Sequence, residues 1–201
     1  MIAIIDYRAG NIASVSNALA RYQIEYEVTN NKNHLNSADG IIFPGVGHAA
    51  SAMEALNDVD LVEWLKATSK PVLGICLGMQ LFYESTEEGE TETLGIIPGR
   101  LKKFDASQAK VPHMGWNTLN NQQEHPVFDK LVSGQFFYFV HSYYAPINEY
   151  TIATSEYIHP FAAAVAYKNY TGVQFHPEKS GKAGAFLLQN FLNEVYHPSK
   201  T

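Results

Sequence analysis

The sequence predicts an α/β fold: one domain over residues 1–201, with a mostly parallel, doubly wound sheet and a mixed or antiparallel extension at one edge. A length of 201 residues with 46% hydrophobic residues suits one globular domain with a sizeable core. Short apolar runs alternate with helix-like segments over the first 85 residues, which is typical of parallel strands joined by helices. After Glu92, strand-like runs rich in aromatic residues follow one another directly.

The first part of the chain contains the alternating elements. Apolar runs predict buried strands over residues 2–6, 25–29, 40–43 and 71–75. A helix through Tyr22 follows a turn at residues 6–11, and Asn11 is a suitable N-cap for it. Helical spacing also predicts a helix that directs Leu61, Trp64 and Leu65 toward the core, and another over about 79–85.

The second part predicts the extension of the sheet. Strand-like runs occupy residues 101–104, 114–119, 134–140, 150–155, 161–167 and 171–175. A last helix is expected over about 183–196, and its apolar stripe comprises Phe186, Leu187, Asn190, Phe191 and Val195. No internal repeat or linker divides the chain.

Composition excludes several classes of function. The formal net charge is −6 and no Lys/Arg-rich run occurs, which argues against a nucleic-acid partner. No apolar run approaches the roughly 18 residues needed to cross a bilayer, and the first residues do not read as a signal peptide. The one cysteine, Cys76, fits a reducing cytoplasm. The eight histidines show no metal-ligand spacing, so we expect neither a metal nor another cofactor.

The segment Gly74-Ile75-Cys76-Leu77-Gly78 is the first candidate for chemistry. A nucleophile between two glycines, after a strand and before a helix, is the pattern of a nucleophile elbow. The flanking glycines leave room for the sharp turn, and the start of a helix favours the reactive thiolate. A lone cysteine is more often a small buried packing residue, but packing alone does not need glycine on both sides.

His176 is the candidate base for this nucleophile. It follows a predicted strand, and strand ends surround the site in a doubly wound sheet. Pro177 favours an extended conformation at His176, which would place Glu178 on the same side of the chain. Glu178 would then accept the ring N–H and fix the tautomer. The alternative for His176-Pro177-Glu178 is an ordinary solvated turn.

Other residues complete a candidate site for acyl transfer. The turn at residues 44–47 and the backbone N–H of Leu77 are candidate donors to an oxyanion. Gln80 lies one helical turn after Cys76. Glu88 stands in an acidic stretch that is usually a solvated loop, and His141 and Ser142 end an apolar strand.

These motifs resemble a known family. Gly-Ile-Cys-Leu-Gly-Met-Gln at 74–80 and Gln-Phe-His-Pro-Glu at 174–178 resemble the class I, or triad, glutamine amidotransferases. Further segments resemble the glutaminase subunit of imidazole glycerol phosphate synthase, the HisH family: Pro-Gly-Val-Gly at 44–47, Val-Pro-His-Met-Gly-Trp-Asn at 111–117, Tyr-Phe-Val-His-Ser-Tyr at 138–143 and Lys-Ser at 179–180. The resemblance covers almost the whole chain.

The resemblance implies a reaction and roles for matching residues. Cys76 would attack the side-chain amide of glutamine, His176 would move the proton, Glu178 would orient His176, and a thioester would be hydrolysed to glutamate. The resemblance assigns oxyanion donors to Gly47 and Leu77. It assigns substrate contacts to Gln80, Glu88, His141, Ser142 and Tyr143.

A partner is expected on physical grounds as well. Ammonia becomes ammonium in neutral water, so it must be passed on directly, and this chain has no second domain to receive it. In the family the receiver is a (β/α)8-barrel cyclase subunit, which forms a heterodimer with the glutaminase. It converts a phosphoribulosyl-formimino carboxamide nucleotide to imidazole glycerol phosphate and an aminoimidazole carboxamide ribotide. Asn11, Tyr138 and Lys179 are the residues expected to face this partner.

One departure and two alternatives accompany the resemblance. Arg8 stands where the family commonly has a small residue, which puts local partner contacts in doubt. One alternative is a glutaminase for anthranilate, aminodeoxychorismate or pyridoxal phosphate synthesis, although these lack the Pro-His-Met-Gly-Trp-Asn segment. The other is a binding module without activity, which the intact Cys, His and Glu set disfavours. The isolated chain is expected to have weak glutaminase activity.

Overall fold

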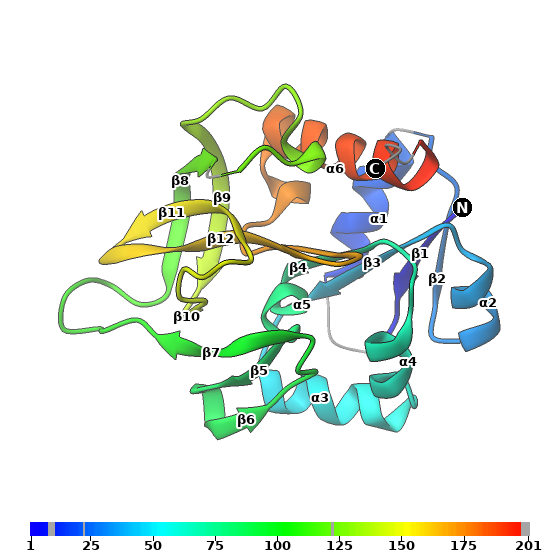
Figure 1. Ribbon diagram of the computed structural model, residues 1–201, viewed down its shortest axis with the longest axis horizontal. Coiled ribbons are helices and arrows are strands. Elements are labelled where there is room, and N and C mark those ends of the chain that lie inside the picture. Colours follow the sequence, from blue (N-terminus) through cyan, green and yellow to red (C-terminus); the bar gives the residue numbers. More distant parts are fainter. Residues whose placement is uncertain (8–10, 22, 122, 198–201) are drawn as a thin grey trace.

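A nine-stranded mixed sheet runs through the whole molecule (Figure 1). The computed structural model describes residues 1–7, 11–21, 23–121 and 123–197. The strand order is β2 (Tyr26–Thr29), β1 (Ile2–Ile5), β3 (Gly40–Gly45), β4 (Val72–Cys76), β13 (Tyr170–Val173), β12 (His159–Tyr167), β11 (Thr151–Tyr157), β8 (His113–Asn121) and β9 (Gln135–His141). From β2 to β13 the neighbours are parallel, and from β13 to β9 they are antiparallel. The predicted fold class is confirmed, including the antiparallel extension at one edge.

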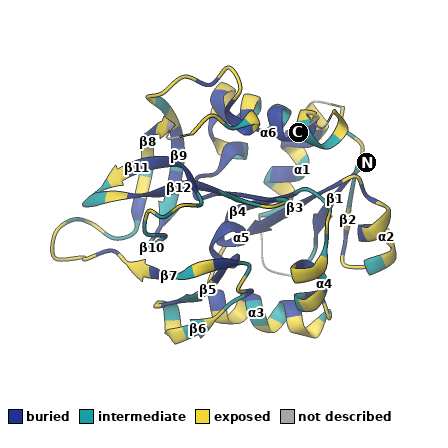
Figure 2. Cartoon of the chain, in the orientation of Figure 1, coloured by how far each residue is buried: buried dark blue, intermediate teal, exposed yellow. Residues whose placement is uncertain are grey.

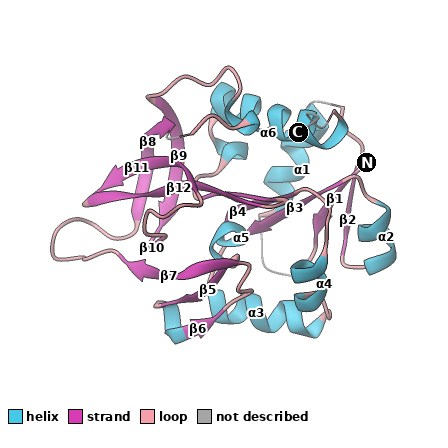
Figure 3. Ribbon diagram, in the orientation of Figure 1, coloured by secondary structure: helices cyan, strands magenta, loops and turns pink. Residues whose placement is uncertain are grey.

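Helices cover both faces of the parallel half (Figure 3). One face packs against α1 (Ile12–Arg21) and α6 (Gly181–Tyr196), and the other against α2 (Lys32–Ser37), α3 (Ala49–Asp58) and α4 (Val62–Ala67). Alternation along β1 shows how one strand serves both: Ile2 and Ile4 join the core with α1 and α6, whereas Ala3 and Ile5 join the other core. The parallel strands β1, β3, β4 and β13 are therefore buried on both sides (Figure 2), whereas the edge strand β2 is partly exposed.

A second, smaller sheet lies on the α3 side, beside the extension (Figure 1). Its order is β10 (Tyr143–Tyr144), β7 (Ile97–Lys103), β5 (Tyr83–Thr86) and β6 (Thr91–Glu92). Short 3-10 turns η1 (Glu88–Glu90), η2 (Pro126–Phe128) and η3 (Pro177–Lys179) complete the elements. Within the described ranges, no helix is both long and apolar enough to cross a membrane.

The structure corrects the expected helix over residues 79–85. Helix α5 spans only Leu77–Gln80, and the chain returns to strand β5 at Tyr83. The run Leu81-Phe82-Tyr83 is completely buried. A short buried apolar run has no helical or strand periodicity of its own, so its conformation depends on the sheet that receives it.

Two smaller expectations also need correction. Phe186, assigned to the apolar stripe of the last helix, is 52% exposed, whereas Leu188 and Leu192 are buried. The other members of the predicted stripe are confirmed: Leu187, Asn190 and Phe191 are buried, and Val195 packs against the same core. Helix α2 was not expected, although Asn31 caps it by accepting a hydrogen bond from the backbone N–H of Asn33 at 2.9 Å. Trp64 is half-buried, and its indole N–H donates to Asn36.

Candidate active site

Cys76 occupies a sharp turn between β4 and α5. Its backbone has φ 55° and ψ −108°, which is a strained conformation for a residue with a side chain. A Cβ on Gly78 would lie 1.9 Å from the carbonyl oxygen of Phe43, and one on Gly74 would lie 2.6 Å from the ring of Phe82. The glycines on both sides of Cys76 are thus required by close packing, as a nucleophile elbow demands.

The helix after Cys76 is a single turn, so little of the expected helix dipole acts on the thiol. The charged group near the sulfur is the imidazole of His176. Burial lowers the pKa of His176, but its interactions with Cys76 and Glu178 outweigh burial and raise that pKa to about 10. At neutral pH the geometry therefore favours a protonated imidazole beside the cysteine.

His176 and Glu178 form a buried pair. The Nδ1 atom of His176 lies 2.8 Å from Oε1 of Glu178, and the two side chains are 2% and 1% exposed. The carboxylate fixes Nδ1 as the donor and leaves Nε2, which has no hydrogen-bond partner among the described residues. An extended chain was expected to align these residues, but the 3-10 turn η3 after His176 brings the carboxylate back to the ring.

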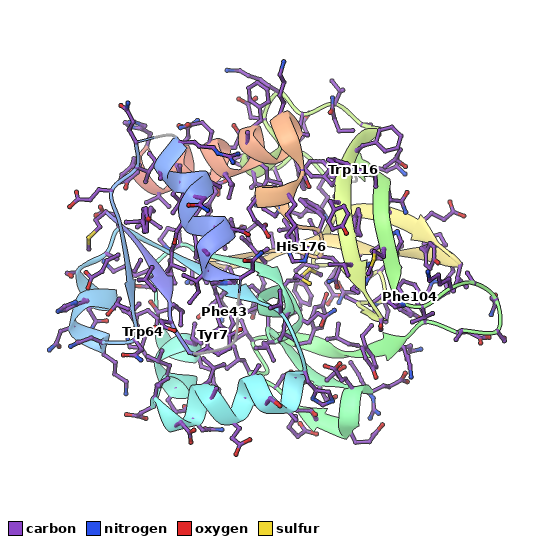
Figure 4. The ribbon with its side chains drawn as sticks, turned by 180° about the vertical axis from the view of Figure 1, so that it is seen from behind. Tyr7, Phe43, Trp64, Phe104, Trp116 and His176 are labelled. Atoms are coloured by element: carbon purple, nitrogen blue, oxygen red, sulfur yellow. The ribbon has the colours of Figure 1, made fainter. Side chains whose placement is uncertain are left out.

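A cavity of about 280 Å³ gathers most of the predicted site residues. His176 is labelled near the middle of the molecule in Figure 4, between the parallel half of the sheet and the strand pair that carries Trp116. The lining residues are Val46, Gly47, Cys76, Leu77, Gln80, Glu88, Pro112, Val140, His141, Ser142, Tyr143 and His176. Nucleophile, imidazole, both candidate oxyanion donors and all five expected substrate contacts thus border one space.

The two candidate oxyanion donors come from neighbouring strands. Gly45 at the end of β3 is paired with Cys76 at the end of β4, so the Gly47 turn lies beside the nucleophile. Gly47 has φ +104°, a conformation that side chains rarely adopt, and a Cβ there would meet nothing within 4 Å. Glycine is needed at this position for backbone conformation and not for space.

The residues expected to contact the substrate differ in how many hydrogen bonds their side chains already make within the protein. Oε2 of Glu88 accepts the backbone N–H of Ala49 at 2.7 Å. Nε2 of Gln80 donates to the carbonyl of Tyr143 at 3.1 Å and to Oε1 of Gln174 at 2.9 Å. His141 is held by Tyr143 and His113, and burial lowers its pKa to about 3. His141 is therefore neutral at physiological pH and positions the wall of the cavity.

Sequence reasoning missed Gln174. This residue is completely buried, and its Nε2 lies 3.7 Å from the sulfur of Cys76. A signal was present, because Gln174 is a polar residue two positions before His176 at the end of a buried strand. In extended chain, residues two apart share a face, so Gln174 belongs on the side of the catalytic imidazole.

The residues expected to face a partner lie outside the cavity. Tyr138, on β9, is half-buried and makes an edge contact with the exposed Trp116 of β8. Its backbone accepts from the N–H of His176 and donates to Ser180, so the face of β9 is tied to the triad segment. Lys179 is exposed and Asn11 half-buried. Arg8 falls outside the described residues.

Comparisons with known proteins identify the family of the chain. The family model described as "Glutamine amidotransferase class-I" matches residues 3–195. A relative from Pasteurella multocida named "Imidazole glycerol phosphate synthase subunit HisH" is 44% identical, covering 96% of this chain and 98% of its own. A relative of the same name from Archaeoglobus fulgidus is 48% identical, covering 97% and 99%.

A solved structure described as a glutamine amidotransferase superposes with a TM-score of 0.75 over 98% of this chain and 100% of its own. Its sequence identity is 15%, so this likeness speaks for the fold alone. The family match and the two full-length relatives go further. The chain belongs to the class I glutamine amidotransferases and, within them, to the HisH subunits of imidazole glycerol phosphate synthase.

Proposed function

We propose that this chain is the glutaminase subunit of an imidazole glycerol phosphate synthase and supplies ammonia for histidine biosynthesis. The observation that carries the proposal is the shared cavity, in which the sulfur of Cys76 and the imidazole of His176 meet the Gly47 and Leu77 turns. A nucleophile, a proton carrier oriented by a carboxylate and backbone donors on both sides are the components of an acyl-transfer site.

The reaction begins with a thiolate and a protonated His176. The sulfur of Cys76 attacks the side-chain amide carbon of glutamine, and the carbonyl oxygen takes up negative charge beside the backbone N–H groups of Gly47 and Leu77. His176 gives its proton to the amide nitrogen as the C–N bond breaks, which releases ammonia and leaves a thioester. Water then attacks the thioester with His176 as base, and glutamate leaves.

The cavity suits a small amino acid substrate. Its volume of about 280 Å³ lies at the lower end of ligand pockets. Glu88 brings a carboxylate to one wall, where it is placed to attract the α-ammonium group of glutamine. The neutral His141 adds no charge that would compete with that recognition.

A cyclase subunit is the proposed receiver of ammonia. The outer side of the β8–β9 pair exposes large apolar side chains: Met114 (62%), Trp116 (56%) and Phe136 (56%). These three residues, called here the outer face, adjoin Tyr138, and exposed apolar patches of this kind mark protein interfaces. Docking there would cover the site and keep ammonia unprotonated. We also propose a cytoplasmic location, because the single cysteine fits a reducing compartment.

The test is Cys76→Ala in the complex reconstituted with a HisH-type cyclase subunit. Glutamine-dependent product formation is expected to fall at least roughly 10³-fold, because the nucleophile is lost. Synthesis from added ammonium salts should stay within about twofold, since the cyclase does not need Cys76. Retained glutamine-dependent synthesis would refute the proposal, and activation of an anthranilate or aminodeoxychorismate synthase instead would reassign the partner.

The isolated chain is expected to hydrolyse glutamine slowly. The turn from Val46 to His48 is exposed, and a Cβ at Gly47 would meet no atom within 4 Å, so packing within this chain does little to restrain the N–H of Gly47. Glutamate release should therefore rise when the cyclase subunit and its nucleotide are added. Equal rates with and without the partner would contradict this expectation.

A further inference from the structure

Gln174 is a buried polar residue that the proposed mechanism does not use. Its exposure is 0%, and a side-chain amide in such a place needs hydrogen-bond partners. It has two: Oε1 accepts from Nε2 of Gln80 at 2.9 Å, and Nε2 donates to the sulfur of Cys76 at 3.7 Å. One end of this amide is thus directed at the reacting atom.

The orientation of the amide follows from its neighbours. The carbonyl oxygen of Tyr143 can only accept, so the group of Gln80 that faces it at 3.1 Å must be the NH₂ group. The second hydrogen of that NH₂ points to Gln174, which must therefore present its oxygen. The NH₂ group of Gln174 is then left for the sulfur, and the usual ambiguity between amide oxygen and nitrogen is removed.

The Tyr143 carbonyl is itself held in place. It accepts a second hydrogen bond, from Nδ1 of His141 at 2.8 Å. His141 must then accept at Nε2, where it meets Nδ1 of His113 at 3.0 Å. Burial lowers the pKa of His113 to about 4 and that of His141 to about 3, so both rings stay neutral and keep these tautomers.

Besides the His176 imidazole, two polar groups lie near the sulfur of Cys76, and they favour opposite protonation states. The carbonyl oxygen of Val140, at 3.9 Å, accepts a hydrogen bond from the thiol but would repel a thiolate. The amide N–H of Gln174, at 3.7 Å, stabilises the thiolate, because a donor to a charged acceptor gains more than a donor to a neutral one. Gln174 therefore adds to the effect of the protonated His176 without itself titrating.

We propose that Gln174 is a further catalytic residue, which stabilises the Cys76 thiolate through its side-chain amide and is held in this orientation by Gln80. The inference rests on the proposed role of Cys76 as the nucleophile. It predicts an effect on the sulfur itself, before any glutamine is bound.

The test is the rate at which iodoacetamide alkylates Cys76 in the full chain, measured against pH. Gln174→Met keeps the volume and removes the donor, and Gln174→Glu replaces the donor by a carboxyl group. We expect the midpoint of the pH profile to rise by about one pH unit in Gln174→Met, so alkylation slows about tenfold at pH values below the wild-type midpoint; this is the lower end for loss of a hydrogen bond to a charged group. Gln174→Glu should be slower still at pH 7, and the midpoint of the pH profile should move upward in both.

Gln108→Glu is the matched control, because Gln108 is exposed and lies outside the cavity. It should alkylate at the wild-type rate. Wild-type rates and profiles, within twofold, in both Gln174 variants would overturn the proposal. Alkylation needs neither glutamine nor the partner, so it tests this inference independently of the proposed function. A Gln174 variant could alkylate slowly and still turn over glutamine normally, or alkylate normally and turn over glutamine slowly, and each result separates the two proposals.

Gln80 provides a second test. Gln80→Met should slow alkylation on the wild-type background but add nothing to Gln174→Met, since Gln80 acts through Gln174. Additive effects would refute the positioning role. If the Gln174 variants no longer melt cooperatively, the test can be made on the wild-type protein. In ¹⁵N-labelled wild-type protein, the side-chain amide resonance of Gln174 should shift with pH, and the midpoint of that shift should equal the midpoint of the alkylation profile. A resonance that ignores this titration would overturn the proposal.

Discussion

Two glycines lie at the catalytic cavity, and the structure requires them for different reasons. Gly78 follows the lining residue Leu77, and its α-carbon is so close to β3 that a Cβ would meet the backbone oxygen of Phe43 at 1.9 Å. Gly47 has empty space around its Cβ position but a backbone conformation, φ +104°, that other residues avoid. The first glycine is fixed by packing on all sides, whereas the second is fixed only by its own torsion angle.

This difference extends to the residues around each glycine. The elbow and the His176–Glu178 pair form the inner wall of the site, which is buried and fully packed. The Gly47 turn lines the same cavity but is exposed, and the outer face of Met114, Trp116 and Phe136 is exposed outside the cavity. These two exposed regions are called here the exposed wall. Variants of the inner wall should therefore alter the chain by itself, and variants of the exposed wall should act mainly through the partner.

The largest effect is expected from Glu178→Gln on the inner wall. Glutamine keeps the shape but removes the carboxylate that orients His176 and that, after Cys76, helps to raise its pKa, so kcat for glutamine hydrolysis should fall roughly 10²–10⁴-fold. Steady-state kinetics of the reconstituted complex measures this. Glu63→Gln is the control, because Glu63 is 79% exposed on α4 and should leave kcat unchanged.

Glu178→Gln should also change how the stability of the chain depends on pH. The folded pKa of His176, raised to about 10, lies above its ordinary value of 6.5, so the folded state holds the proton more tightly. The resulting stabilisation is complete below pH 6.5 and is lost as pH rises through about 10. Glu178→Gln should therefore destabilise the chain most below pH 6.5 and least near pH 10, in urea unfolding. A loss of stability in Glu178→Gln that grows as pH rises would contradict the pairing of His176 with Glu178.

Gly78→Ala should have the next largest effect, on stability. The added methyl group must push β3 away from the elbow, an overpacking cost of about 3 kcal/mol. For a chain of this size that lowers Tm by about 6–12 °C. Calorimetry or thermal circular dichroism measures the shift. A Tm within about 2 °C of wild type would show that β3 moves easily to make room for the methyl group. It would contradict the distinction between a packed inner wall and an exposed wall.

How much of the site the sequence predicts depends on whether a feature is set by neighbouring residues or by tertiary packing. The elbow was predicted because Gly74, Cys76 and Gly78 carry their constraint locally, in spacing alone. The contact of Gln174 with the sulfur was not, because it depends on Gln80 and Tyr143, which are distant in sequence. Hydrogen bonds between buried polar side chains depend on tertiary packing, and a single sequence does not show which of these side chains lie next to one another.

The elements show the same division. Parallel strands such as β1 and β4 are apolar throughout, and their length and the turns that bound them identify them. The helix expected over 79–85 was wrong after Gln80, because β5 forms by pairing with β6 and β7, which lie further along the chain. Phe186 was likewise placed by helical periodicity, which gives the spacing of an apolar face but not the direction in which neighbouring elements lie.

On the exposed wall, Trp116→Ala tests the docking surface. Trp116 is 56% exposed, so the stability of the isolated chain should change by less than about 0.5 kcal/mol. Large aromatic residues commonly dominate interfaces, and affinity for the cyclase subunit should fall about 30-fold, or about 2 kcal/mol. Tyr196→Ala is the control, because Tyr196 is an exposed aromatic residue near Asp39 and Glu25, far from β8. Unchanged affinity in Trp116→Ala would place the partner elsewhere.

Gly47→Ala should disturb the fold less than Gly78→Ala does, and it distinguishes the two walls most directly. The methyl group meets no atom within 4 Å, so only the torsion angle resists it, at about 1–2 kcal/mol. Calorimetry should therefore show a smaller loss of Tm than in Gly78→Ala. If alanine shifts the turn to an ordinary torsion angle, the N–H of Gly47 no longer faces the oxyanion, and kcat in the complex should fall more than stability does. A Tm loss equal to that of Gly78→Ala, with kcat preserved, would mean that both walls are structural and that the oxyanion donor comes from another residue.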